Sequence, residues 1–232
     1  MKDQRSKHLE RIRKLKRREY HPLLHEAHKR HGISRKTLFY VKEYGPHSNA
    51  ARTIIRESAK ILVLASVISS LGGLALESLK AAFLAITPLV VLLPTLNDAI
   101  GDFGTIASSR FSTMLHEGKA RGSLFENEEL RRLFVQIIIV ALLAAGFAAG
   151  AALIISGFSG YSATLETAAK VFLVALVDAA ILVCLLFAIA VAAGRHFYEK
   201  GEDPNNFLIP ITTAVADFAN MAILAVLVTV FF

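Results

Sequence analysis

The chain has 232 residues, 54% of them hydrophobic, and a mean hydropathy of +0.49. Residues 1–60 carry 17 of the 26 Lys and Arg and 6 of the 19 Asp and Glu, a net charge of +11, whereas residues 61–232 carry −4. This split indicates one cationic part in water and one apolar part in lipid, which excludes a lone soluble enzyme domain. The single cysteine, Cys184, excludes an intrachain disulfide, a zinc ribbon and a redox pair.

Residues 1–52 are predicted to form a basic helical segment in the cytoplasm. They lack the apolar core of a signal peptide, and their charge confines them to water or to lipid headgroups. His21, His25 and His28 share one helical face, but no carboxylate or cysteine framework accompanies them, so we favour a solvated helix over a metal site. No nucleic-acid binding is expected, because basic runs beside a first membrane helix mostly set topology.

Residues 53–232 are predicted to form an all-α, polytopic membrane domain with five transmembrane helices. About 18 consecutive apolar residues are enough to span a bilayer. Three segments meet this length, and two shorter ones meet it if their polar flanks continue as helix. In chain order the five are Ile61–Leu76, Ala81–Asn97, Leu133–Leu165, Val171–Ala193 and Phe207–Phe232.

The distribution of Lys and Arg predicts the orientation of these spans in the cell membrane. The positive-inside rule places the N-terminal segment in the cytoplasm, and five crossings then leave the C-terminus outside. Lys119–Arg132 and Gly194–Asn206, predicted inside, are richer in Lys and Arg than Glu77–Lys80 and Gly157–Lys170, predicted outside. The charge rule and the number of spans therefore agree.

Polar residues interrupt three of the predicted spans at helical spacing. An Asp at the centre of a membrane helix costs roughly 2.5–3.5 kcal/mol, so such residues tend to face a water-filled path or a partner. Residues at these spacings share one helical face. The stripes are Ser66, Ser69, Gly73 and Glu77 in the first span, Asp98, Asp102, Thr105, Ser109, Ser112 and His116 in the second, and Thr213, Asp217 and Asn220 in the last.

Turned toward a common axis, these stripes would line a path for a hard cation. Carboxylates and hydroxyls suit such ions, and Mg²⁺ keeps several waters and needs only one or two carboxylates. Few, well-spaced carboxylates therefore suit Mg²⁺ better than a dry Ca²⁺ site, but Mn²⁺ or Co²⁺ would fit the same oxygens, and none of these residues separates the three ions. The candidate metal ligands are Asp217, Asp102, Thr213, Asp98, Asn220 and Thr105.

Some of these polar residues have a second interpretation. Ser66 and Ser69 suit helix–helix packing as well as an ion path. Asp178 is isolated in its span, and it is interpreted either as a second ion or proton site or as a partner of a residue such as Arg110.

The segment Pro94–Gly118, PTLNDAIGDFGTIASSRFSTMLHEG, resembles the membrane domain of the MgtE-type and solute-carrier-41 magnesium transporters. Gly101-Asp102 stands where that family usually has Gly-Asn, and the run from Ala107 to Thr113 follows. Asp203-Pro204, Pro210, Thr213 and Asp217 look like the family's terminal helix, whose Asp lines the ion path. The resemblance implies a homodimer with the pore between the subunits.

Two other functions stay open from the sequence. One is a proton- or sodium-coupled transporter of another solute that uses Asp102, Asp178 and Asp217 as carriers of the coupling ion. The other is a membrane-anchored binding protein that acts through residues 1–60. No enzyme activity is expected, because no nucleophile–base pair or catalytic metal motif emerges.

Overall fold

A computed structural model describes residues 50–78, 80–120, 126–200 and 203–232. Within these ranges the chain is helical and contains no strand, and five of its helices are long and apolar enough to cross a membrane. The all-α, five-span prediction is confirmed. The helices are α4 (Ala50–Ser78), α5 (Lys80–Ala85), α6 (Thr87–Glu117), α7 (Glu128–Phe158), α8 (Leu165–Glu199) and α9 (Pro204–Phe231). The predicted helical conformation of the basic segment falls on residues 1–49, outside the described part.

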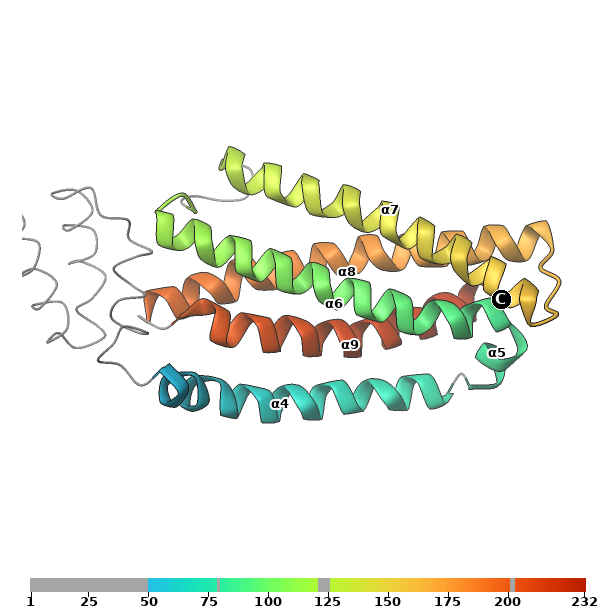
Figure 1. The fold of residues 1–232 in the computed structure, drawn as a ribbon, viewed down its shortest axis with the longest axis horizontal. Helices are drawn as coiled ribbons and strands as arrows, with labels where there is room; N and C mark the ends of the chain where they lie inside the picture. Colours follow the sequence, from blue (N-terminus) through green and yellow to red (C-terminus); the bar gives the residue numbers. More distant parts are fainter. Residues whose placement is uncertain (1–49, 79, 121–125, 201–202) are drawn as a thin grey trace, which may run out of the picture.

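The five long helices run back and forth along one axis, so the first and last described residues lie at opposite ends of the bundle (Figure 1). The α6–α7 and α8–α9 connections share an end with the start of α4. Lys119, Arg131 and Arg195 lie near that end, and Lys80 and Lys170 lie near the other. The bundle therefore carries the charge asymmetry on which the predicted orientation depends.

The second span begins later than predicted. Residues 80–85 form the separate short helix α5, and Ile86 breaks the helix with φ −117° and ψ 80°. Pro88 follows in the first turn of α6, where a missing backbone N–H costs nothing. The expected polar flank does continue as helix, to Glu117, and Gly118 then caps α6 in the left-handed conformation.

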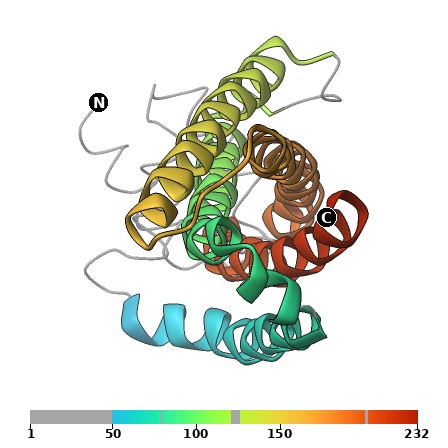
Figure 2. The same cartoon turned by 90° about the vertical axis from the view of Figure 1, so that its right-hand side faces the viewer.

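Helix α6 occupies the centre of the bundle and packs against α7, α8 and α9, whereas α4 packs along α9 (Figure 2). It packs tightly against α8 at Gly194. A Cβ atom there would lie 2.8 Å from the ring of Phe111 and 3.1 Å from Leu208 Cδ1. Phe111 is fully buried, so its ring has little room to move away.

Helix α4 is held to α9 by small contacts along its length. Pro210 has no backbone N–H, so it cannot donate to the carbonyl of Asn206 one turn earlier, and Ser58 Oγ donates to that carbonyl at 3.3 Å. At Gly72 an added Cβ would lie 3.2 Å from the backbone of Phe218. The opposite side of α4 is apolar and exposed at Leu62, Val63, Leu64, Val67, Leu71 and Leu74, as expected of a lipid-facing surface.

Replacing Gly194 by Ala should destabilise the protein, because the new methyl group overlaps Phe111. Overpacking of this kind costs about 1–3 kcal/mol, against a gain in helix propensity of about 1 kcal/mol. The matched control is Gly146→Ala on α7, where an added Cβ meets nothing within 4 Å. In detergent, Gly194→Ala should unfold at a lower temperature than Gly146→Ala, and the reverse order would contradict the packing described here.

Candidate functional site

Four side chains from three helices form one hydrogen-bonded cluster, which we call the amide–carboxylate cluster. Asp217 of α9 accepts from Ser69 Oγ of α4 at 3.0 Å through Oδ2, and from Asn97 Nδ2 of α6 at 2.9 Å through Oδ1. Asn97 in turn accepts from Asn220 Nδ2 of α9 at 2.9 Å. The cluster fixes the orientation of the Asp217 carboxylate and joins α4, α6 and α9 at one level.

Asn97 is the central member of this cluster, and it was not among the predicted site residues. It both donates to Asp217 and accepts from Asn220, so it bridges two turns of α9. The sequence contains a signal for it: an amide beside Asp98 inside an apolar run, where an unpaired polar group would be costly. The apolar run predicts Asn97 as the end of the second span, whereas α6 continues through it.

The predicted stripe on α6 separates into an exposed part and a buried part. Asp98, Asp102 and Ser109 are exposed and Thr105 is half-buried; these four residues are called the polar face of α6. Further along the same helix Ser112 and His116 are buried, and the His116 ring packs edge-on against Tyr198 with 5.2 Å between centroids. The stripe therefore does not present one continuous open surface in a single copy.

The structure brings together two of the three residues predicted on α9. Asp217 and Asn220 both bond to Asn97, whereas Thr213 is exposed and forms no hydrogen bond with the cluster in the described part of the chain. Its neighbour Thr212 is the residue that reaches α6: its hydroxyl lies 3.2 Å from Ser108 Oγ and also donates to the Leu208 carbonyl. Thr213 lies one turn before Asp217 on the same side of α9.

Only one residue of the predicted stripe on α4 reaches the cluster. Ser66 donates to the carbonyl of Leu62 in its own helix, and Glu77 lies 3.8 Å from Lys80 at the end of the bundle. Ser69 alone extends to Asp217. The stripe on α4 is therefore a single contact rather than a lining.

Asp178 and Arg110 are not paired. Asp178 on α8 has no exposed surface, and neither carboxylate oxygen has a hydrogen-bond partner in the described part of the chain. Arg110 is exposed on α6. The structure therefore does not support a pairing of Asp178 with Arg110.

No hydrogen bond joins Asp102 to Asp217 in the part of the chain that the structure describes, although both lie in the middle part of the bundle. Asp102 stands between Asn97 and Ser108 along α6, and Thr213 stands between their partners Asp217 and Thr212 along α9. Among the described residues, no three or more His, Cys, Asp or Glu side chains are grouped as metal ligands. The six predicted ligands are therefore divided between the cluster and the two exposed sides of α6 and α9.

Comparisons with protein families and with known proteins give matches that cover most of this arrangement of residues. A family model described as divalent cation transporter, MgtE, matches residues 93–227, which include three members of the amide–carboxylate cluster and the whole polar face. Solute carrier family 41 member 2 of Macaca fascicularis is 31% identical over 192 residues, that of Homo sapiens 30% over 192, and that of Gallus gallus 29% over 195.

Each of these three matches covers 76% of this chain and 32% of the relative. The chain thus spans about a third of the length of the curated relatives it matches. No solved structure matches it.

Replacing Asn97 by Ala should destabilise the bundle, because it leaves the Asn220 amide and one Asp217 oxygen without their partner. A buried group left unpaired costs about 1–3 kcal/mol. Thr95→Ala is the matched control on the same helix, since Thr95 is exposed and bonds only to the Val91 carbonyl. Thermal unfolding in detergent measures both, and equal midpoints would show that the cluster does not hold the helices together.

Proposed function

This chain belongs to the MgtE family of divalent cation transporters, and we propose that it carries a divalent cation, Mg²⁺ foremost, across the membrane along a path between two copies. Mn²⁺ and Co²⁺ would fit the same oxygens. The observation that carries the proposal is the exposure of two carboxylates, Asp98 and Asp102, near the middle of a membrane-spanning helix.

The length of α6 places these carboxylates inside the hydrocarbon. The helix has 31 residues, about 46 Å at its usual rise, against a hydrocarbon thickness of roughly 30 Å. Asp98 and Asp102 are more than ten residues from either end. Lipid contact would be costly for both, so water or a second copy of the chain has to cover them.

A second copy related by a two-fold axis would turn two polar faces toward each other. Such an interface is self-complementary, and it doubles every carboxylate along the path. Asp98, Asp102, Thr105 and Thr213 then supply oxygens for a hydrated cation, with Asp217 and Asn220 beside them. The sides of α6 and α9 that the described residues of one copy leave exposed become the lining of the path.

The chemistry of Asp217 suits an ion that keeps its waters. A carboxylate offers about four acceptor positions, and Ser69 and Asn97 occupy two of them. The remaining positions can accept from the waters of a hydrated Mg²⁺, which dehydrates reluctantly. The amides of the cluster hold the carboxylate in place, so its orientation is preorganised for the ion.

The proposal also covers the cellular membrane in which the chain lies and its orientation there. We propose a plasma-membrane protein with residues 1–52 as a cytoplasmic segment and residues 53–232 as the transport unit. The end of the bundle that holds Lys119, Arg131 and Arg195 would face the cytoplasm. The C-terminus would then lie outside.

A second candidate function is transport coupled to protons or sodium. The observation that favours it is Asp178, a fully buried carboxylate without a hydrogen-bond partner in the described residues. An ionisable residue inside the membrane is often part of an ion or proton relay. A flux that requires a proton or sodium gradient would support coupling, whereas Mg²⁺ flux without either gradient would support passive transport.

Asp217→Asn should reduce divalent-cation flux by at least about tenfold, because it removes the charge while keeping the size of the side chain. The measurement is Mg²⁺ uptake into liposomes that contain the full chain, with Mn²⁺ and Na⁺ in parallel. Ser66→Ala is the control, since Ser66 is exposed and bonds only within α4. Wild-type flux in Asp217→Asn would overturn the proposed ion path.

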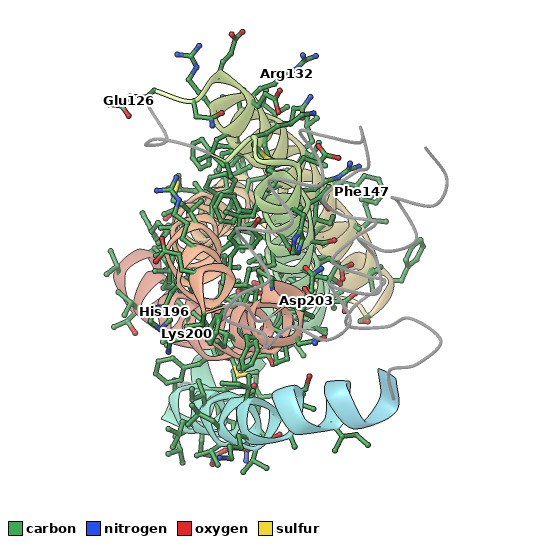
Figure 3. All side chains as sticks on the ribbon, turned by 90° about the vertical axis from the view of Figure 1, so that its left-hand side faces the viewer. Glu126, Arg132, Phe147, His196, Lys200 and Asp203 are labelled. Carbon is green, nitrogen blue, oxygen red and sulfur yellow. The ribbon has the colours of Figure 1, made fainter. Side chains whose placement is uncertain are left out.

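Asp102→Cys should form a disulfide-linked dimer on mild oxidation in membranes, because the polar faces of two copies meet. The background is Cys184→Ser, which removes the one native thiol. Phe147→Cys serves as control: Phe147 is 80% exposed on the outer side of α7 (Figure 3). If Asp102→Cys yields no more dimer than Phe147→Cys, the interface lies elsewhere.

A further inference from the structure

A groove between α6 and α7 lies outside the proposed ion path. It encloses about 360 Å³ and is open on its outer side. Its floor and walls are mostly apolar, with Phe103 and Ile106 from α6 and Ile137 and Val140 from α7. Leu133 of α7 and two polar side chains, Arg110 and Gln136, complete the lining.

Arg110 gives the groove an uncompensated positive charge. Its side chain is exposed, and no carboxylate lies within 4 Å of it in the part of the chain that the structure describes. Since Arg110 precedes Glu117 by two turns of α6, it lies about 10 Å from the end of the helix, close to the hydrocarbon boundary. An arginine at this depth requires an anion or water, because an unpaired charge there is costly.

Apart from Leu133, which lies nearer the start of α7, the order of the lining residues along the two helices matches the order of groups in a phospholipid. Arg110 lies seven residues before the end of α6 and Gln136 eight residues after the start of α7, and both offer N–H donors, which suit a phosphate and the ester carbonyls next to it. Phe103 lies two turns deeper on α6, and Val140 lies one turn deeper than Gln136 on α7, because the two helices run in opposite directions (Figure 1). The deeper part therefore offers an apolar channel where an acyl chain would run.

We propose that this groove binds one anionic phospholipid of the adjacent leaflet, with its phosphate on Arg110 and one acyl chain between α6 and α7. The occupant is a lipid rather than a soluble phosphate, because apolar side chains form most of the groove, and Ile106 and Val140 are exposed on two helices that are long and apolar enough to cross a membrane. The groove is also distinct from the polar face: Ile106 and Arg110 lie on the side of α6 toward α7, next to Asp102 and Ser109. The proposed lipid site does not depend on whether the chain conducts cations.

The test is native mass spectrometry of the full chain in detergent, titrated with phosphatidylglycerol and, separately, with phosphatidylcholine. The wild type should bind one phosphatidylglycerol more tightly than phosphatidylcholine. Arg110→Gln should weaken that binding about tenfold, the loss expected for one charge-assisted contact. Arg132→Gln is the matched control, since Arg132 is an exposed arginine at the same end of the bundle that does not line the groove (Figure 3).

A second variant tests the acyl-chain position without touching the charge. Val140→Trp fills the apolar part of the groove and should lower the binding of both lipids while leaving Arg110 in place. Two results would overturn the proposal: unchanged phosphatidylglycerol binding in both variants, or an efficient disulfide between Ile106→Cys residues of two copies in a Cys184→Ser background. The second result would show that another copy of the chain fills the groove.

Discussion

Asp98 and Asp102 extend from the middle of α6, and a carboxylate that faces hydrocarbon without a partner is strongly disfavoured. The backbone of α6 meets the demands of the membrane by itself, because each N–H bonds within the helix. The carboxylates of Asp98 and Asp102 are not satisfied by these backbone hydrogen bonds. The exposed polar face thus requires a covering that the described residues of one copy do not supply, and the proposed two-fold path would meet that requirement.

Two adjacent residues show how α6 divides its surface. Asn97 points into the bundle and bonds to Asp217 and Asn220, whereas Asp98 is exposed. Successive residues of a helix are rotated by about 100° about its axis, so Asn97 lies on the internal, hydrogen-bonded side of α6 and Asp98 on its outward side. The inward side fixes the distance between α6 and α9, and this distance places the outward carboxylates relative to Thr213. The internal cluster thus positions the polar face without forming part of it.

Much of this arrangement could be predicted from the sequence, and the exceptions have physical reasons. Long apolar runs identified the five spans, and helical spacing placed Asp217 and Asn220 on one side of α9. The break at Ile86 was missed because Lys80–Ala85 is itself a good helix former, and only the following Pro88 marks the new start. Thr212 was passed over for Thr213 because spacing alone does not tell which side of a helix meets a neighbour; Ser108 on another helix decides it.

The bond from Ser69 to Asp217 links α4 to any ion bound at that carboxylate. A cation that coordinates Oδ2 directly draws charge from the oxygen that accepts from Ser69 Oγ, so it weakens this hydrogen bond between α4 and the cluster. Occupancy of the carboxylate and docking of α4 on α9 are then linked equilibria, and each weakens the other by the same factor. An ion held through its water shell leaves Ser69 in place and pushes nothing aside. The position of α4 would thus indicate whether the bound ion has kept its water shell.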